Sequence, residues 1–305
     1  MKVLICASGN AGQLSPFVQE QADSLNKLGI QIDYFLITGN GVLGYLKNYP
    51  LLIKTIKGKK YNLIHAHYGL TGLLATLQKI TPVIVTFHGS DVNMKKNLPL
   101  SLLASRLSYD NIFVHHYLPK KLKISGKNIH IIPCGVNLDI FSPMNKIIAR
   151  DKLGWNKKKN YILFSSGFDN PVKNATLAKS ALESLDLEIE LIELKGYTKK
   201  EICILMNAAD LLLVTSISET GPIVVKEALS CNCPIVSTNV GDVKSITKNI
   251  NNCFITSYDP KKVGEKIREI LASGLRSNGR VFMDSYGLDK IAKKVIMAYE
   301  TTLKI

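Results

Sequence analysis

The sequence predicts an α/β protein built from two parallel sheets, each with helices on both faces. Apolar runs of strand length alternate with segments of helical periodicity, the alternation starts again at residue 161, and a stretch without clear periodicity separates the two series. Continuous apolar strands separated by helices are typical of a parallel sheet that is buried on both faces. We therefore expect two Rossmann-like halves with a cleft between them, and ligands at the carboxyl ends of the strands.

The first half holds four strand-like runs and one clear helix between the first two. The helical segment "PFVQEQADSLNKLG" has apolar residues at helical spacing and ends on Gly29, a typical helix stop. The strand-like runs are "KVLICAS", "IQIDYFLIT", "YNLIHAH" and "PVIVTFHG".

The second half repeats the pattern with the runs "YILFSSG", "DLLLVTS", "CPIVST" and "NCFITS". The join between the halves is predicted in "IIPCGVNLDIFSPMNK", which contains two prolines and no clear periodicity. We predict a first domain over residues 1–143, a second over residues 144–286, and a final helix over residues 287–305 that packs back on the first domain.

Composition and cysteine spacing favour a globular protein with reduced thiols. A chain of 305 residues that is 46% hydrophobic can bury two cores. The six cysteines form no C-x-x-C pair and mostly lie in apolar runs, which predicts reduced thiols, a cytoplasmic protein and no metal site built on thiolates. The sequence shows neither a signal peptide nor an apolar run of the roughly 18 residues that span a membrane.

Charge is concentrated in the first half of the chain. Residues 1–150 hold 17 basic and 6 acidic residues, whereas residues 151–305 hold 22 and 18. A basic half indicates an anionic partner, either nucleic acid or a lipid surface, although solubility alone also accounts for it.

Glycines and histidines follow the strands of the first half. In "SGNAGQLSP", Gly12 permits a close backbone approach ahead of a helix start, so a tight turn and a phosphate loop both remain open. The loop lacks G-x-G-x-x-G spacing, which disfavours a dinucleotide site. "IHAHYG" and "TFHGSD" place His65, His67 and His88 after two strands, where any one of them could be a core residue. His88 is the strongest candidate for an acid, base or polar clamp.

Cations and carboxylates follow the strands of the second half. Lys173, near a helix start, suits a diphosphate. Glu219 precedes a predicted helix and Glu227 lies inside it, with a Gly-Pro break after the first. Amides at residues 221–224 would point toward an anion, while the two carboxylates accept hydrogen bonds from sugar and ribose hydroxyls. This pattern indicates a site for a nucleotide sugar.

These motifs make the chain resemble the retaining GT-B glycosyltransferases of sequence family four, the glycosyl transferases group 1. The resemblance runs nearly end to end, and its most specific part is Glu219 and Glu227 between "NAADLLLVTS" and "PIVSTNVGDV". "HAHYG", "TFHGSD", "IPCGVNLDIFSP" and "VKNATLAKSA" support it in the expected order.

The resemblance implies an α/β GT-B fold of two Rossmann-like domains with an interdomain cleft, and it implies roles for individual residues. His88 and Glu219 would be catalytic and contact the donor sugar. Lys173 would hold the diphosphate, Glu227 the ribose and Tyr197 the base. The other implied donor-binding residues are Gly12, Gly221, Pro222, Ile223 and Val224.

Two positions depart from the family pattern. Phe168 stands where relatives usually carry an arginine, so neutralisation of the diphosphate would rest more heavily on Lys173. Thr220 stands where a glycine is common, and because a β-branched residue rarely takes a positive φ, we expect Gly221 to carry it.

The resemblance also implies a mechanism and substrates. We expect a retaining, hexosyltransferase-like enzyme in which the acceptor attacks on the face that the leaving diphosphate departs from. No D-x-D sequence occurs, so we predict no metal and no cofactor beyond a donor such as a UDP- or GDP-sugar. The acceptor would be a glycan or a lipid-linked glycan in bacterial surface polysaccharide biosynthesis.

Three other functions remain open. A nucleotide-sugar epimerase would use the same double fold but needs further acid and base residues. An NAD-dependent oxidoreductase is disfavoured by the glycine spacing. A non-catalytic nucleic-acid-binding protein would explain the charge, but the chain lacks a recognisable module, so we predict no nucleic-acid partner.

One basic segment suggests where the enzyme works. Residues 45–60, "YLKNYPLLIKTIKGKK", place apolar residues on one helical face and lysines on the other, with Pro50 as a helix start or kink. A core-packed helix with a solvated lysine face is one interpretation. The other is docking on the anionic inner face of the cytoplasmic membrane, as a peripheral protein. The lysines concerned are Lys47, Lys54, Lys57, Lys59 and Lys60, joined by Lys95, Lys96, Lys120, Lys121 and Lys123.

Overall fold

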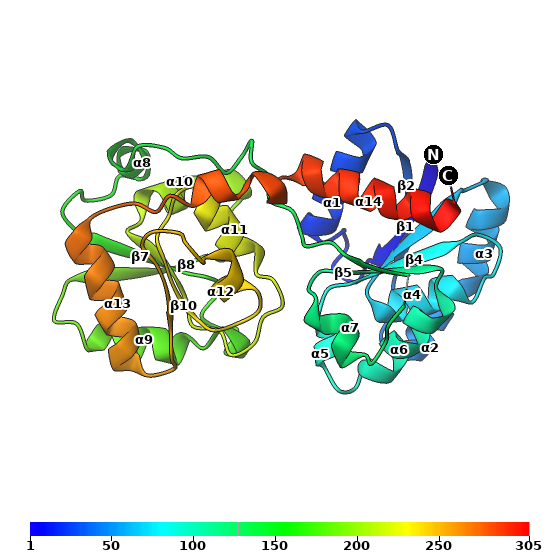
Figure 1. The fold of residues 1–305 in the computed structure, drawn as a ribbon, viewed down its shortest axis with the longest axis horizontal. Coiled ribbons are helices and arrows are strands. Elements are labelled where there is room, and N and C mark those ends of the chain that lie inside the picture. The colour runs from blue at the N-terminus through cyan, green and yellow to red at the C-terminus, as the bar shows by residue number, and fades with distance from the viewer. Residues whose placement is uncertain (127, 305) are drawn as a thin grey trace. The chain divides into compact units, whose positions relative to one another are not determined.

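The computed structural model describes residues 1–126 and 128–304, which form two compact α/β units (Figure 1). Unit 1 comprises Met1–Gly135 and the chain from Leu288 onward, and unit 2 comprises Val136–Gly287. The parallel sheets and flanking helices confirm the predicted fold class. Among the described residues, no helix is both long and apolar enough to cross a membrane.

The chain enters unit 2 earlier than the predicted boundary at residue 143. Val136 and Phe141 are buried in the core of unit 2. The Val136 N–H also donates to the Tyr286 carbonyl over 2.9 Å, and Val136 forms an isolated bridge with Gly287. The apolar side chains of this connecting segment therefore commit it to unit 2, so the units divide between Gly135 and Val136.

Within the described part of unit 1, six parallel strands form one sheet in the order β2-β1-β3-β4-β5-β6. The central strands β3 and β4 are buried along their whole length. The strands are β1 (Lys2–Ser8), β2 (Gln31–Ile37), β3 (Leu63–His67), β4 (Val83–Phe87), β5 (Asp110–Phe113) and β6 (Ile129–Ile131).

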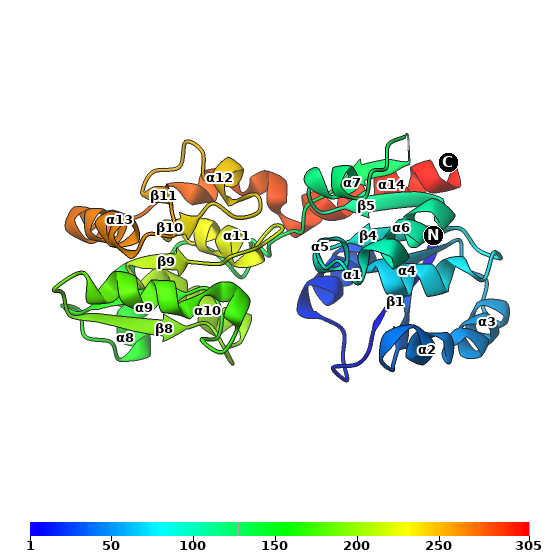
Figure 2. The same ribbon diagram turned by 90° about the horizontal axis from the view of Figure 1, so that it is seen from below.

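Helices cover both faces of this sheet, and the last helix of the chain is one of them. α14 (Leu288–Leu303) packs beside α1 (Pro16–Lys27), as Figures 1 and 2 show, and its buried face includes Ile291, Val295 and Tyr299. The helix predicted for residues 287–305 thus belongs to unit 1. The other helices are α2 (Gly41–Leu46), α3 (Tyr49–Gly58), α4 (Gly69–Thr76), α5 (Ser90–Asn93), α6 (Leu98–Leu107) and α7 (Tyr117–Lys121).

All residues of unit 2 are described, and five parallel strands form its sheet in the order β11-β10-β9-β7-β8. The strands are β7 (Asn160–Phe164), β8 (Ile189–Glu193), β9 (Leu211–Val214), β10 (Ile235–Thr238) and β11 (Cys253–Thr256). The helices are α8 (Lys146–Leu153), α9 (Ala175–Glu183), α10 (Lys199–Ala208), α11 (Ile223–Ser230), α12 (Val243–Ile246) and α13 (Pro260–Ser273), with 3₁₀ turns η1 (Pro171–Lys173), η2 (Gly279–Phe282) and η3 (Asp284–Tyr286).

Each sheet has an apolar core on both of its faces. In unit 2, β9 sends Leu212 and Val214 to one face and Leu211 and Leu213 to the other. Burying a side chain of this size contributes about 1.5–3 kcal/mol, so these cores hold the strands and leave the strand ends to carry polar groups. The carboxyl ends of the parallel strands therefore form the edge at which each unit can bind ligands.

Candidate active site

The polar residues predicted in the second half lie at the carboxyl ends of neighbouring strands in the unit 2 sheet. Lys173 follows β7, Tyr197 follows β8 and Glu219 follows β9. These three strands are neighbours and parallel, so their carboxyl ends meet at the same edge. The fold therefore brings together three loops that are separated by up to 46 residues in the chain, the distance from Lys173 to Glu219.

Lys173 and Glu219 form an ion pair. The Lys173 ammonium donates to Glu219 Oε1 over 2.6 Å, and the Ser216 hydroxyl donates to the same oxygen over 2.9 Å. The side chains of Lys173 and Glu219 are only 18% and 16% exposed. Charged hydrogen bonds that are partly shielded from water are stronger than exposed ones. The pair therefore fixes both groups at the strand edge.

The loops that carry this pair are tied to each other. The Thr215 hydroxyl donates to the carbonyls of Lys173 and Asn174, each over 2.9 Å. The Ile217 N–H donates to the Val172 carbonyl over 2.8 Å. Asn174 takes a left-handed φ of 55° and its side chain caps α9, which ends the turn that presents Lys173. These bonds hold the two loops in register, so the ion pair is supported by backbone contacts.

Glu227 has its own cationic neighbour. It lies on α11 and is buried, with 7% exposure, and the Lys199 ammonium is 3.7 Å from its Oε1. Lys199 is the first residue of α10, whose start is fixed by a capping box between Thr198 and Glu201. Sequence reasoning missed Lys199, although its place at a helix start two residues after Tyr197 is a signal that could have found it. Tyr197 is 43% exposed.

The turn before α11 differs from the expected one. Neither Thr220 nor Gly221 has a positive φ, so the prediction that Gly221 would carry it is wrong. Gly241 takes the positive φ, 53°, in a facing loop that runs close behind the Thr220 carbonyl. Pro222 caps the helix and has no N–H, so the backbone donors at this helix start belong to Gly221, Ile223 and Val224.

Phe168 occupies a packed position. Its N–H donates to the Glu193 carboxylate over 2.7 Å, and its ring lies against Phe164 with 5.2 Å between centroids. The Lys179 ammonium lies 5.0 Å from the centre of the Phe168 ring. The expected arginine is therefore replaced by an aromatic ring with a lysine over it, a cation–π contact.

In unit 1, Gly12 closes a tight turn. Its N–H donates to the Gly9 carbonyl over 2.9 Å, and its φ of 77° is one that residues with a Cβ rarely adopt. The tight turn left open by the sequence is present, immediately ahead of α1. The Gly12 N–H is used by this turn.

The three histidines converge in unit 1, because β3 and β4 are adjacent strands. His67 Nδ1 lies 3.0 Å from His88 Nε2, and the His65 and His67 rings have 4.3 Å between centroids. His65 is anchored by Tyr299 and Thr86, each over 2.7 Å. His65 and His67 are fully buried and His88 is half-buried. Only His88 is therefore placed to meet a ligand.

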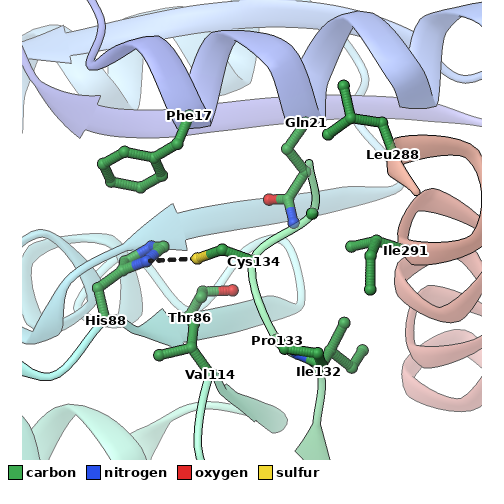
Figure 3. A pocket seen from close by; sticks show the side chains of 11 residues that line it. Phe17, Gln21, Thr86, His88, Val114, Ile132, Pro133, Cys134, Leu288 and Ile291 are labelled. Atoms are coloured by element: carbon green, nitrogen blue, oxygen red, sulfur yellow. Dashed lines mark hydrogen bonds between the residues drawn. The ribbon is translucent and has the colours of Figure 1, made fainter. Parts of the chain in front are cut away.

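His88 lines a pocket at the carboxyl edge of the unit 1 sheet (Figure 3). Cys134 lies beside it, with 4.0 Å between the Cys134 sulfur and His88 Nδ1. The aromatic rings of Phe17 and Tyr68 flank the imidazole at 4.8 and 4.7 Å between centroids. Tyr68 has a φ of 72°, an uncommon angle for an aromatic residue, so backbone strain is concentrated next to His88.

The Asp91 carboxylate holds the loops around His88. It accepts the N–H groups of Gly69 and Gly89 over 3.1 and 2.8 Å. Burial raises the pKa of Asp91 to about 6, against the lowering effect of these backbone hydrogen bonds. Burial also lowers the pKa of His67 to about 3, and lowers that of His88 well below its usual value. The histidines are therefore neutral at pH 7.

Two family models match successive parts of the chain. Residues 3–140 match Glycosyltransferase Family 4, and residues 183–280 match Glycosyl transferases group 1. Together they cover most of the chain. The first includes Gly12 and His88, and the second includes Tyr197, Glu219 and Glu227 but begins after Lys173. The chain belongs to the GT-B glycosyltransferases of group 1. It is therefore an enzyme of the glycosyltransferase class.

Curated relatives are glycosyltransferases of low sequence identity. An uncharacterized glycosyltransferase of Methanocaldococcus jannaschii is 25% identical over 85% of this chain and 81% of its own length. A UDP-Gal:alpha-D-GlcNAc-diphosphoundecaprenol alpha-1,3-galactosyltransferase of Escherichia coli is 24% identical over 69% of this chain and 66% of its own. A D-inositol 3-phosphate glycosyltransferase of Xylanimonas cellulosilytica is 24% identical, and the match covers 52% of it.

Solved structures share the GT-B fold along the whole chain. Sucrose-phosphate synthase from Thermosynechococcus elongatus has a TM-score of 0.84 at 16% identity, covering 100% of this chain and 99% of that one. Anabaena HepE in complex with UDP has a TM-score of 0.78 at 15% identity, covering 99% and 100%. At these identities the likeness establishes the fold of this glycosyltransferase.

Proposed function

We propose that this glycosyltransferase moves a sugar, with retention of configuration, from a nucleotide-sugar donor to a glycan or lipid-linked acceptor. The observation that carries the proposal is the ion pair of Lys173 and Glu219 at the carboxyl edge of the unit 2 sheet. A cation for phosphate and a carboxylate for hydroxyls stand side by side there, and a second pair, Lys199 and Glu227, lies on the helices that follow.

The donor would be held by complementary groups. The Lys173 ammonium and the N–H groups at the start of α11 donate to diphosphate oxygens, while Glu219 accepts from hydroxyls of the transferred sugar. Glu227 accepts from the ribose hydroxyls, and the exposed ring of Tyr197 supports the base.

A UDP-sugar is the donor best supported. HepE, which shares the fold, has been solved with UDP and with UDP-glucose, and the Escherichia coli relative is named for UDP-Gal. That relative is also named for a diphosphoundecaprenol acceptor, which supports a lipid-linked acceptor and a role in surface polysaccharide biosynthesis. A GDP-sugar remains the second candidate.

The protein's share in the reaction is positioning and electrostatic stabilisation. Lys173 and the α11 amides would stabilise charge on the departing diphosphate, which itself takes the proton of the attacking hydroxyl on the same face. Because a lysine and helix amides can neutralise the diphosphate, we propose a metal-independent transfer that persists in a chelator. Loss of activity in EDTA, restored by magnesium or manganese, would contradict this part.

The experiment that tests the proposal is a donor screen on the full chain. UDP, GDP, UDP-glucose, UDP-galactose and GDP-mannose are titrated by calorimetry, and the positive donor is incubated with a panel of glycan and polyprenyl-diphosphate-glycan acceptors. Nuclear magnetic resonance of the product reports whether the anomeric configuration is kept. The proposal predicts saturable binding of at least one nucleotide sugar; binding of none, or an inverted product, would overturn it.

We further propose that unit 1 docks on an anionic membrane surface through the lysine face, defined as Lys47, Lys54, Lys57, Lys59 and Lys60. All five residues are exposed. Of the two alternatives for Pro50, the helix start is the one observed: α2 ends at Leu46, and α3 starts at Tyr49 with Pro50 in its first turn. The apolar side of α3 packs into the core through Leu52 and Ile56, which leaves its lysines on the outer side.

Apolar side chains accompany the lysine face. α2 has no buried residue. Its Val42, Leu43 and Leu46 are 41%, 77% and 41% exposed, and Leu51 on α3 is 57% exposed. Exposed leucines next to lysines are the combination that partitions into the interface of an anionic bilayer. This supports a peripheral location at the inner face of the cytoplasmic membrane.

A further inference from the structure

His67 and His88 share one hydrogen bond that fixes where their protons are. His67 Nδ1 and His88 Nε2 are 3.0 Å apart, and the two ring planes differ by only 20°. A hydrogen bond between two neutral imidazoles needs an N–H on one nitrogen and a lone pair on the other. Either His67 donates to His88, or His88 donates to His67.

The other nitrogen of His67 decides between the two. His67 Nε2 is buried and has no hydrogen-bond partner among the described residues. A buried N–H without an acceptor is rarer in proteins than a buried lone pair without a donor. The His67 proton therefore lies on Nδ1 and is donated to His88, so His88 accepts at Nε2 and carries its own proton on Nδ1.

That Nδ1–H edge of His88 is the one that faces the pocket. Figure 3 shows the His88 ring directed toward Cys134, and Phe17 and Gln21 of α1 line the same pocket. A thiol at 4.0 Å is a weak acceptor at long range. The N–H is therefore directed to a place that a substrate oxygen can occupy.

The surroundings keep both rings neutral. The titratable groups beside them are His65, Tyr68 and Cys134, while α1 contributes Phe17 and Gln21, and α14 contributes apolar Leu288 and Ile291. Asp91 is engaged by the backbone N–H groups of Gly69 and Gly89. Burial lowers the pKa of both imidazoles, so neither gains a second proton at pH 7.

We propose that His67 is a positioning residue that holds His88 as a neutral Nδ1–H donor, so that His88 acts on the sugar substrates as a hydrogen-bond donor and not as a base. The role of His88 in sugar transfer rests on the proposed function. The assignment of protons to the nitrogens of His67 and His88 does not rest on that function, and it can be measured without substrate.

The test is long-range ¹H–¹⁵N correlation on histidine-labelled full-length protein, with two variants of His67. His67→Asn keeps a side-chain N–H near the position of Nδ1, whereas His67→Leu removes it. We expect a single Nδ1–H form of His88 in the wild type and in His67→Asn. In His67→Leu we expect a mixture of tautomers and a higher His88 pKa.

Turnover is measured in parallel. His67→Leu should lower kcat about tenfold or more with little change in the donor KM, since a small loss of orientation is enough for that effect, and His67→Asn should recover most of it. His116→Asn, at an exposed position, is the matched control. An Nε2–H form of His88 in the wild type would overturn the inference, as would an unchanged single tautomer in His67→Leu.

Discussion

Lys173 Nζ lies 2.6 Å from Glu219 Oε1, so the cation proposed for the diphosphate and the carboxylate proposed for the sugar are ion-paired with each other. Since both side chains are mostly buried, the charge of each is neutralised by the other and not by water. A ligand that offers phosphate to Lys173 and a hydroxyl to Glu219 can replace this pair without leaving either group unpaired. In the proposed donor complex, the pair would couple the diphosphate on one side of the reacting bond to the sugar on the other.

Lys173→Ala should lower kcat strongly, because no arginine stands at position 168 to share the diphosphate charge. It also leaves Glu219 a partly buried carboxylate without its cation, so a small loss of stability is expected. Steady-state kinetics and thermal unfolding measure the two effects. Lys200→Ala removes an exposed lysine from the same unit and is the control. Equal kcat values for the two variants would exclude the diphosphate role of Lys173.

The two glutamates should separate binding from turnover. Glu227→Ala removes a charged acceptor from the ribose, a loss of about 1.5–3 kcal/mol, or roughly ten- to a hundredfold in donor Kd. Glu219→Ala should reduce kcat more than affinity, because that carboxylate is proposed to contact the transferred sugar. Calorimetry and initial rates distinguish them, with exposed Glu183→Ala as the control. Unchanged Kd and kcat in both variants would exclude a nucleotide-sugar site on this edge.

Gly241→Ala should impair donor binding although Gly241 itself is not proposed to contact the donor. The φ at Gly241 is 53°, and an added Cβ would lie 2.6 Å from the Thr220 carbonyl oxygen. The turn before α11 would have to shift, and with it the Gly221 N–H. We expect a higher donor Kd and a Tm lower by a few degrees, whereas Gly154→Ala, at a helix end with open space around it, should affect stability only. Normal donor affinity in Gly241→Ala would show that this loop does not set the turn.

The histidine cluster should make unit 1 sensitive to acid. Burial lowers the pKa of His67 to about 3 in the folded state, whereas the unfolded chain binds that proton near pH 6.5. The unfolded state therefore holds more protons in this interval, so His67 stabilises the fold above about pH 6.5 and the contribution is lost as pH falls. The lowered pKa values of His65 and His88 act in the same direction.

Asp91 acts in the opposite direction. Its pKa of about 6 means that its stabilising contribution is present at low pH and declines as pH rises toward 6. Because three histidines oppose one aspartate, we expect a net loss of stability between pH 7 and pH 5. Urea unfolding at both pH values should show a smaller loss in His67→Asn than in the wild type. An identical pH dependence would mean that His67 is not held neutral by the fold.

Strands β1 to β4 were predicted from the sequence, whereas β5 and β8 were missed. β9 stands out as a continuous apolar run, and β1 is apolar along most of its length. By contrast, β5 starts with the buried polar residues Asp110 and Asn111, and β8 at the edge of its sheet contains two glutamates. Site residues that follow a strand could be found in the same way, since strand ends are visible in the sequence. Which strands are neighbours is not visible there, so the contact of His67 with His88 and the contact of Lys199 with Glu227 needed the structure.

The lysine face should make the protein bind anionic vesicles at low salt. Each lysine near such a surface contributes about 1 kcal/mol, and this attraction is screened as ionic strength rises. We expect the wild type to sediment with phosphatidylglycerol-containing vesicles at low salt, to be released at high salt, and to ignore neutral vesicles. A triple variant with Glu at positions Lys54, Lys57 and Lys60 should no longer sediment with these vesicles, while its donor affinity stays normal. Lys59 is left unchanged because its ammonium is paired with the Asp33 carboxylate over 3.1 Å.

The control for this experiment carries the same change of charge in unit 2, at the exposed residues Lys158, Lys244 and Lys248. If net charge alone drove adsorption, both triple variants would lose it equally, whereas a localised lysine face predicts loss in the first variant only. Leu43→Gln, on α2, tests the apolar part. It should weaken binding and leave its salt dependence unchanged, because it removes apolar area that would be buried in the bilayer and removes no charge. A wild type that stays in the supernatant with anionic vesicles at low salt would exclude membrane docking by this face, and a freely diffusing acceptor would then be the better proposal.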